Sequence, residues 1–379
     1  MACATAAKDQ IMHIGVPKEI KVHEYRVGLT PAAVAELTAR GHHVLVETGA
    51  GAGIDFGDDD YIAAGARIIA TPEAVFSGSD MIVKVKEPQL HECAWLKPHH
   101  ILFTYLHLAA DKPQAEALMA SGATCIAYET VTDRAGGLPL LRPMSEVAGR
   151  MSIQVGAHYL EKEAGGRGVL LGGVPGVAPG RVAILGGGVS GVNAAQMAVG
   201  LRADVTIFDI STARLAEIDT MFDGRVKTEF ASRAAIADAV ANAHVVIGAV
   251  LVPGAAAPKL VSRSMLGTMK RGSVLVDIAI DQGGCFETSH ATTHDDPVYI
   301  VDGIIHYCVA NMPGAVARTS TFALGNATLP FVLRIADAGA EAAMAADPHL
   351  AAGLNVAGGQ IRHQAVADAL ELPFAAPSA

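Results

Sequence analysis

The clearest motif in the chain is RVAILGGGVSGVNAAQMAVGLRADVTIFDI, residues 181–210. It begins with an apolar run at 182–185, continues into the pattern Gly186-x-Gly188-x-x-Gly191, and then becomes rich in alanine. This strand–loop–helix order is typical of dinucleotide sites: the first glycine permits a tight turn, the second lets the backbone approach a pyrophosphate, and the third lets helix and strand pack closely. The N-terminus of the following helix adds N–H groups and a positive dipole end for the phosphates.

An acidic residue follows this loop at the expected distance. A second apolar run, DVTIFD, ends in Asp209, eighteen residues after Gly191. A carboxylate there accepts hydrogen bonds from ribose hydroxyls and repels a 2′-phosphate, so the sequence predicts NAD rather than NADP, although the nearby cation of Arg214 could tolerate that phosphate. The alternative is a tight turn with a capping aspartate and no ligand. The loop also contains Val189, whose apolar side chain should matter little if backbone N–H groups hold the phosphates.

The composition limits the class of protein. The chain has 379 residues, 51% of them hydrophobic and 17% charged, which is enough for two buried cores and argues against disorder. A formal net charge of −10 provides no general basic surface for nucleic acid or anionic lipid. The five cysteines form no C-x-x-C pair and no signal peptide is evident, so we expect reduced thiols in a soluble, cytoplasmic protein. No cluster has metal-ligand spacing, so we expect no metal.

One uncharged run is long enough to span a bilayer. Residues 182–201 are twenty consecutive residues without a charge. They include five glycines together with Ser190, Asn193 and Gln196. This content fits a buried strand, turn and helix better than a membrane helix, so we predict no membrane span.

The rest of the chain repeats the same rhythm of apolar runs and alanine-rich stretches. Continuous Val/Ile/Leu runs separated by helices indicate parallel strands covered on both faces. We therefore predict an α/β fold of two doubly wound Rossmann-like domains with a cleft between them. The first boundary falls near 136–150, where Ser145 is a candidate N-cap or anion contact of a long helix. The last strand-like segment ends near Pro313, and residues 319–379 are predicted to be helical and to pack back on the first domain.

Several polar residues follow strand-like runs, where ligands of parallel α/β sheets gather. A surface salt bridge is the alternative explanation for Arg26, and at most one of the two strand lysines needs to be functional. A lone histidine is more often structural, an aspartate can cap a turn, and Cys285 lacks a recognisable histidine partner. The residues alone predict a cationic site with a His and an Asp that faces a nicotinamide, which suits an anionic substrate and acid–base assistance. The candidates are Arg26, Lys84, Lys86, His107, Asp277 and Asp281.

A series of motifs resembles the L-alanine dehydrogenase family in order from about Ile11 onward. That family is related to the soluble NAD-binding part of nicotinamide nucleotide transhydrogenase. The first ten residues match nothing in the family, and we expect them to be disordered. The motifs are GVPKEIKVHEYRVGLTPAAVAEL, KVKEP, LFTYLHLAA, YETV, PMSEVAGR, GGVPGV, GGGVSG, IGAVLVPGAAAPKLV, VDIAIDQGGCFE and YCVANMPGAV.

The resemblance implies roles for individual residues. Arg26 and Lys86 fall on the positions that bind the substrate carboxylate and oxo group. His107 falls on the acid–base position, and Asp281 on that of its partner across the site. Ala231 stands where a cofactor-contacting serine is expected, and Ser232 could substitute for it. Further cofactor positions are Ser145, Asp209, Arg214, Val250, Leu251, Ile278, Ala279, Ile280, Asp281, Val309, Ala310, Asn311 and Met312.

The resemblance also implies a function and an assembly. It predicts reversible, NAD-dependent oxidative deamination of L-alanine to pyruvate and ammonium by a homohexamer. Residues 1–140 with 318–379 would form the substrate-binding, catalytic domain, and residues 141–317 the NAD-binding domain. Two alternatives remain open: a transhydrogenase-like NAD(H)-binding module, and a dehydrogenase of another small 2-oxo acid such as glyoxylate.

Overall fold

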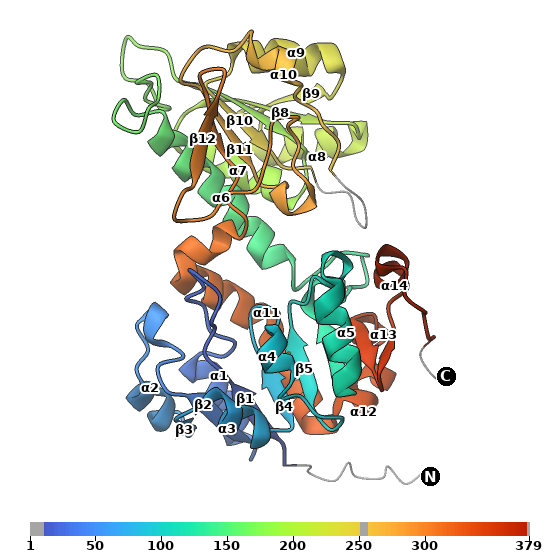
Figure 1. The fold of residues 1–379 in the computed structure, drawn as a ribbon. Coiled ribbons are helices and arrows are strands. Elements are labelled where there is room, and N and C mark those ends of the chain that lie inside the picture. The colour runs from blue at the N-terminus through green and yellow to red at the C-terminus, as the bar shows by residue number, and fades with distance from the viewer. Residues whose placement is uncertain (1–10, 251–256, 377–379) are drawn as a thin grey trace. The chain divides into compact units, whose positions relative to one another are not determined.

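The computed structural model describes residues 11–250 and 257–376, so the prediction for residues 1–10 lies outside the described part. The chain divides into two units, 1–144 with 316–379 (unit 1) and 145–315 (unit 2). Helix α6 (Arg142–Tyr159) carries the chain from unit 1 into unit 2, and α11 (Ala317–Ala338) begins after its return (Figure 1). The cleft predicted between two domains stays a prediction.

Unit 1 contains an eight-stranded sheet in the order β15-β14-β6-β5-β4-β1-β2-β3. Strands β1 to β6 are parallel, and β14 pairs antiparallel with both β6 and β15. The chain runs from β1 outward to β3 and then places β4 on the other side of β1, so the strand order reverses between β1 and β4. The strands are β1 (His13–Val16), β2 (His43–Glu47), β3 (Arg67–Ile69), β4 (Met81–Val83), β5 (Ile101–Thr104), β6 (Thr124–Ala127), β14 (Leu354–Ala357) and β15 (Gln360–Ile361).

The helices of unit 1 begin at recognisable capping residues. Thr30 and Asp111 each accept a backbone N–H of the first turn that follows, and a proline stands at the start of both helices. The helices are α1 (Pro31–Ala39), α2 (Asp58–Ala63), α3 (Pro72–Ser77), α4 (Leu90–Cys93), α5 (Lys112–Ser121), α11, α12 (Ala340–Ala346), α13 (Pro348–Ala351) and α14 (Gln364–Leu370), with 3₁₀ turns η1 (Ala52–Ile54), η2 (Leu108–Ala110) and η3 (Tyr128–Thr130).

The C-terminal region differs in part from its prediction. Residues 319–379 were expected to be helical throughout, but they also supply β14 and β15 to the edge of the unit 1 sheet. These strands are short and are joined through the turn at Gly358 and Gly359, so the alanine-rich helices on either side mask their pattern. The region belongs to unit 1, in agreement with the expectation that it packs back on the first domain.

The six parallel strands of unit 2 repeat the order of the six parallel strands of unit 1. Its seven-stranded sheet runs β12-β13-β11-β10-β7-β8-β9, is parallel except for β12, and reverses its order between β7 and β10. The prediction of two doubly wound α/β sheets is confirmed. The elements are β7 (Arg181–Leu185), α7 (Val189–Gly200), β8 (Asp204–Asp209), α8 (Thr212–Phe222), β9 (Lys227–Phe230), α9 (Arg233–Asn242), β10 (Val245–Gly248), α10 (Arg263–Leu266), β11 (Val274–Asp277), η4 (Ile280–Gln282), β12 (Val298–Val301), β13 (Ile304–Tyr307) and η5 (Met312–Val316).

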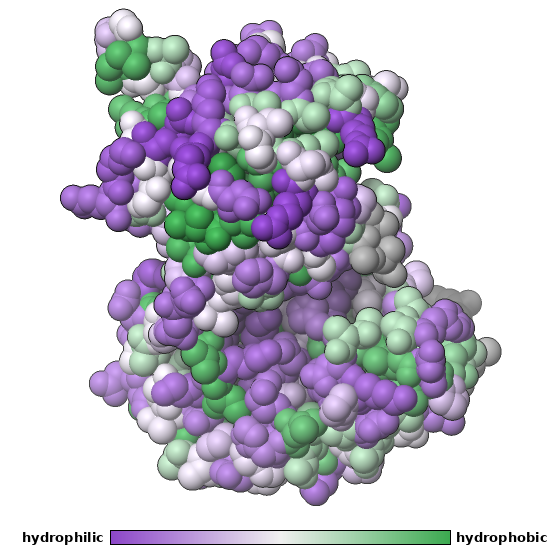
Figure 2. Space-filling view, turned by 45° about the horizontal axis from the view of Figure 1, so that its top comes forward, coloured by the Kyte–Doolittle hydropathy of each residue, from purple (hydrophilic) through white to green (hydrophobic). Residues whose placement is uncertain are grey.

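The central strands lie in the core of each unit. Every residue of β4, β5, β10, β11 and β13 is buried, as expected of parallel strands covered by helices on both faces. Residues 182–201 form most of β7, the glycine loop and α7, and none of the helices within 11–250 and 257–376 is apolar over a membrane-spanning length. On the face drawn in Figure 2, hydrophilic residues predominate and hydrophobic ones form patches between them.

Candidate active site

The glycine loop of unit 2 assigns a separate role to each of its glycines. Gly186 has φ of +106°, a conformation that glycine adopts without a Cβ penalty. A Cβ on Gly191 would lie 1.8 Å from the Gly186 carbonyl oxygen, so the helix packs too closely on the loop for any side chain there. A Cβ on Gly188 would meet nothing within 4 Å. Open space beside Gly188, at the start of α7, is what a pyrophosphate requires.

Asp209 holds the same loop from the end of β8. Its Oδ2 accepts the Gly187 N–H at 2.8 Å, and its Oδ1 accepts the Ser211 N–H at 2.8 Å. Arg214 donates from Nε to the Gly187 carbonyl oxygen at 2.7 Å and pairs with Glu217 through Nη1. The expected acid and cation therefore both lie against the loop, and the carboxylate fixes the loop backbone in addition to any contact it makes with a ribose.

The other predicted cofactor segments end neighbouring strands of the same sheet. Val250 follows β10, and its side chain lies beside the space that a Cβ on Gly186 would occupy. Residues 278–281 follow β11, and the Ile278 N–H donates to the Gly248 carbonyl oxygen. Residues 309–312 follow β13, with Asn311 in a left-handed conformation. Strands β7, β10, β11 and β13 are parallel neighbours, so the residues that follow β10, β11 and β13 gather at the edge that carries the glycine loop. These residues are Val250, Ile278, Ala279, Ile280, Asp281, Val309, Ala310, Asn311 and Met312.

The remaining cofactor candidates of unit 2 are Ser145, Ser232 and Leu251. Ser145 lies inside α6, three residues after its start, so the N-cap interpretation is wrong. Ser232 caps α9, since its Oγ accepts the Ala235 N–H, and its substitution for the serine missing at Ala231 stays a prediction. Leu251 lies outside the described residues.

Asp277 and Cys285 are structural. The buried Asp277 carboxylate accepts hydrogen bonds from the N–H groups of Ala279 and Cys285 and from Ser289 Oγ, so the turn-cap interpretation is confirmed. Cys285 is fully buried, and burial raises the pKa of its thiol to about 12, which disfavours the thiolate that a nucleophile needs.

The polar candidates of unit 1 follow neighbouring parallel strands. Arg26 lies in the segment after β1, both lysines follow β4 and His107 follows β5. In the sheet these strands stand in the order β5-β4-β1, so their carboxyl ends share one edge. The strand order reverses between β1 and β4, and Arg26 and the lysines therefore flank the point where doubly wound sheets bind ligands.

The structure separates the two lysines. Strand β4 ends at Val83, so Lys84 and Lys86 both lie beyond it, and the expectation of two lysines on one face of a strand is wrong. Lys84 is fully buried between two carboxylates, with Nζ 2.8 Å from Glu92 Oε1 and 3.3 Å from Glu19 Oε2. Burial alone would lower the pKa of Lys84, but the two carboxylates outweigh it and raise the pKa, so the ammonium stays charged.

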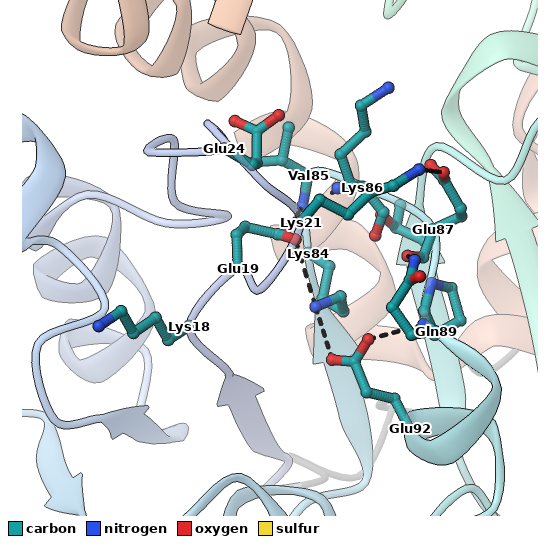
Figure 3. A network of polar contacts seen from close by, with 12 residues as sticks. Lys18, Glu19, Lys21, Glu24, Lys84, Val85, Lys86, Glu87, Gln89 and Glu92 are labelled. Atoms are coloured by element: carbon teal, nitrogen blue, oxygen red, sulfur yellow. Dashed lines mark hydrogen bonds and ion pairs between the residues drawn. The ribbon is translucent and has the colours of Figure 1, made fainter. Parts of the chain in front are cut away.

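Lys86 is the lysine with its charge still available. It is half-buried and points away from the Lys84 cluster, as Figure 3 shows. In the described part of the chain it belongs to no ion pair. Its backbone N–H donates to Glu19 Oε1 at 3.2 Å, and the Val85 N–H donates to the same oxygen at 2.6 Å. The Glu19 carboxylate thus pairs with the ammonium of Lys84 and also accepts the backbone N–H of Lys86.

Arg26 lies in a buried ion pair and not on the surface. Its Nε and Nη2 donate to the two oxygens of Glu24 at 2.6 and 2.5 Å, and its Nη1 donates to the Met144 sulfur at 3.1 Å. Burial alone would lower the pKa of Arg26, but Glu24 raises it. The surface salt-bridge interpretation is wrong, since the guanidinium is 2% exposed.

Two family models together match almost the whole chain. "Alanine dehydrogenase/PNT, N-terminal domain" matches residues 15–148, and "Alanine dehydrogenase/PNT, C-terminal domain" matches residues 152–364. The chain belongs to the alanine dehydrogenase/PNT family. The alanine dehydrogenase of Halomonas elongata is 60% identical over 363 residues, 96% of this chain and 98% of that protein. The alanine dehydrogenase of Bacillus subtilis is 56% identical over 357 residues, 94% of each chain.

Solved structures of the family superpose closely. A structure of L-alanine dehydrogenase gives a TM-score of 0.92 at 53% identity, covering 95% of this chain and 99% of that one. A transhydrogenase structure from Sinorhizobium meliloti gives 0.79 at 26% identity, covering 93% and 99%. The likeness is closer to the dehydrogenase branch of the family than to this transhydrogenase.

Sequence reasoning missed the carboxylates that organise the unit 1 edge. Glu19 and Glu24 lie in the run KEIKVHEYR, where the alternating charges read as solvated, and Glu92 begins no recognisable motif. Glu129 lies in YETV, one of the family motifs, but nothing in its spacing indicates a partner. Their roles depend on contacts between distant strands, which periodicity does not reveal.

Proposed function

We propose that this protein catalyses the reversible oxidative deamination of L-alanine to pyruvate and ammonium. The observation that carries the proposal is the 52–60% identity to curated alanine dehydrogenases over nearly the whole chain, which makes it an NAD-dependent alanine dehydrogenase. The comparisons favour neither a transhydrogenase-like NAD(H) module nor a dehydrogenase of glyoxylate.

The residues of unit 2 fit NAD. Gly188 leaves open space at the start of α7, Gly186 makes the turn, and Asp209 stands at the end of β8 beside the loop. When bound there, NAD takes up the hydride that leaves the α-carbon of alanine. The remaining tasks fall to side chains: holding the carboxylate, stabilising the oxygen that develops and moving protons.

Arg26 would bind the substrate carboxylate. A guanidinium has five N–H donors in a rigid fork, and Glu24 takes one edge of it. The Nη1 donor points to the sulfur of Met144, which is a weak acceptor. A carboxylate forms a much stronger, charge-assisted bond than a thioether and would therefore displace this contact. Glu24 would keep the fork oriented.

Lys86 and His107 would act on the reacting centre. After hydride loss the substrate is an iminium, and water adds to it to give a carbinolamine. The Lys86 ammonium would stabilise the oxygen of the carbinolamine and of pyruvate. His107 would take the proton from the attacking water and return it as the amine leaves. Asp281, in η4 after β11, is assigned its role as partner of the acid–base residue by the resemblance alone.

A direct assay tests the proposal. NADH oxidation is followed by absorbance with ammonium and each of a set of 2-oxo acids that includes pyruvate and glyoxylate. We expect pyruvate to give the highest kcat/KM and the rate to depend strictly on ammonium. Oxidation without ammonium, or a preference for glyoxylate, would overturn the assignment of L-alanine as substrate.

We further propose a cytoplasmic homohexamer. The four cysteines within the described residues are free and buried, as expected of a chain kept in a reducing compartment. The hexamer rests on the family resemblance. Light scattering on the purified protein tests it, and a mass other than that of six chains would contradict it.

A further inference from the structure

The backbone of His107 is strained. Its φ of 52° and ψ of 34° place it in the left-handed region, which a residue with a Cβ enters only at a cost in free energy. Such a conformation persists only where the surrounding structure enforces it. The exposed side chain makes no cap hydrogen bond to η2, so the hydrogen bonds that hold this backbone are those of its main-chain groups.

That contact comes from Glu129. Its Oε1 accepts the N–H of His107 at 2.6 Å, and both of its oxygens lie 3.2 Å from the N–H of Leu106. A carboxylate that accepts backbone N–H groups forms stronger bonds than a neutral acceptor. Glu129 reaches these groups from η3, directly after β6, the sheet neighbour of β5.

The ring of His107 is also aligned. It stacks on Tyr105, with 5.6 Å between ring centroids and 9° between ring planes. The hydroxyl of Tyr105 donates to the Leu140 carbonyl oxygen at 2.5 Å, which fixes the platform. Glu129 holds the backbone of His107, and Tyr105 stacks on its ring. Together these two contacts fix the orientation of the imidazole.

The segment that carries Glu129 is itself held from the C-terminal region. The Ala127 N–H donates to the Gly353 carbonyl oxygen at 2.7 Å, and Asn355 Nδ2 donates to Thr130 Oγ1 at 2.7 Å. The strand β14, which the sequence did not predict, therefore supports the turn from which Glu129 reaches His107.

We propose that Glu129 is a positioning residue for the acid–base histidine. It acts through the backbone, by holding His107 in the left-handed conformation that presents its ring. The inference rests on the proposed role of His107. Glu19 makes the same contact at the neighbouring strand β4, where it accepts the N–H groups of Val85 and Lys86, so each of the two proposed reacting side chains has a carboxylate on its backbone.

A set of variants tests this proposal. Glu129→Ala should lower kcat about 10–100-fold, since a misplaced catalytic group of this kind costs up to about 10². The Kd for NADH, measured by fluorescence titration, and the KM for pyruvate should change less than about twofold. Glu129→Gln retains a neutral acceptor and should recover part of the loss. Asp133→Ala is the matched control, since Asp133 accepts two backbone N–H groups, of Ala135 and Gly137, in the same unit.

The decisive measurement is the double variant with His107→Ala. If Glu129 acts through the histidine, Glu129→Ala adds no further loss to the residual rate of His107→Ala. Equal fractional losses in the two backgrounds, or a wild-type kcat in Glu129→Ala, would overturn the proposal for Glu129 alone. A His107→Ala enzyme with near wild-type turnover would instead overturn the proposed role of His107. If Glu129→Ala does not fold, Glu129→Gln carries the same comparison.

Discussion

The two sheets share one strand order but present different chemistry at their carboxyl edges. In unit 2 the strand order reverses between β7 and β10. The carboxyl edge at that point, the backbone edge, is formed by glycines and backbone N–H groups, with open space at Gly188. In unit 1 the corresponding edge, the side-chain edge, carries the charged side chains of Arg26, Lys84 and Lys86, and carboxylates pair with Arg26 and Lys84. One topology therefore carries two kinds of edge, a glycine loop with open space beside it and a set of charged side chains, and either kind suits an anion.

At both edges, carboxylates hold the loops in place by accepting backbone N–H groups. Glu19 and Glu129 in unit 1 each accept consecutive backbone N–H groups just after a strand. Asp209 and Asp277 in unit 2 accept backbone N–H groups of the loops that follow β8 and β11. These acids compensate N–H groups left unpaired where a strand ends. The two edges therefore differ in the groups that their loops expose. The loops themselves are fixed in the same way, by carboxylates.

The largest effect is expected from the side-chain edge, at His107. His107→Asn should lower turnover in both directions by about 10²–10⁴-fold, because a positioned acid–base group typically supplies that factor. The binding of NADH should be unchanged, since we assign that task to the backbone edge of unit 2. Steady-state rates paired with NADH-fluorescence titration measure both. His158→Asn, an exposed histidine of α6, is the control, and equal rates in the two variants would remove His107 from the mechanism.

The sequence predicted the backbone edge far better than the side-chain edge. The three glycines and Asp209 have fixed spacings because one loop must turn, approach a phosphate and pack on a strand within a few residues. The structure shows the predicted turn at Gly186 and the predicted close packing at Gly191. The phosphate contact at Gly188 and the ribose contact of Asp209 stay predictions. The alternation of strands and helices likewise predicted both sheets, because parallel strands buried on both faces leave a continuous apolar pattern.

The side-chain edge could be predicted only in outline. Sequence reasoning placed Lys84 and Lys86 on one face and could not tell the structural lysine from the available one. That distinction depends on Glu19 and Glu92, which come from other segments of the chain. Nor could it find Glu129, whose partner lies twenty-two residues away on a neighbouring strand. Local periodicity contains no information about such pairs.

The two lysines provide the next test. Lys84→Met should lower the free energy of unfolding by about 3–5 kcal/mol, because it leaves two buried carboxylates without their cation. Lys86→Met should leave stability nearly unchanged and reduce turnover, because Lys86 belongs to no ion pair among the described residues. Urea unfolding and pyruvate amination rates measure the two quantities. The separation of roles would be wrong if both variants lost the same property.

The backbone edge is tested by adding one methyl group. Gly188→Ala should weaken NADH binding about 10–100-fold without loss of folding, because its Cβ enters the space where a pyrophosphate approaches, and a few lost hydrogen bonds are worth about 1–3 kcal/mol. Gly200→Ala, at the other end of α7, also meets nothing within 4 Å and is the matched control. Equal NADH affinity in the two variants would show that the phosphates do not lie at this loop.

The smallest effect is expected from Asp209, the acidic residue beside the glycine loop of unit 2. Asp209 fixes the loop through Gly187, and we propose that its charge also faces the ribose of the cofactor. Asp209→Ala should raise kcat/KM for NADPH relative to NADH by about tenfold, because the repulsion of a 2′-phosphate disappears while Arg214 remains beside the loop. Asp209→Asn removes the charge but retains an acceptor for the loop N–H. It should change the preference to a similar extent with a smaller loss of total activity. If the wild-type enzyme already used NADPH as well as NADH, or if neither variant changed the ratio, the carboxylate would serve the loop alone and cofactor choice would have another origin.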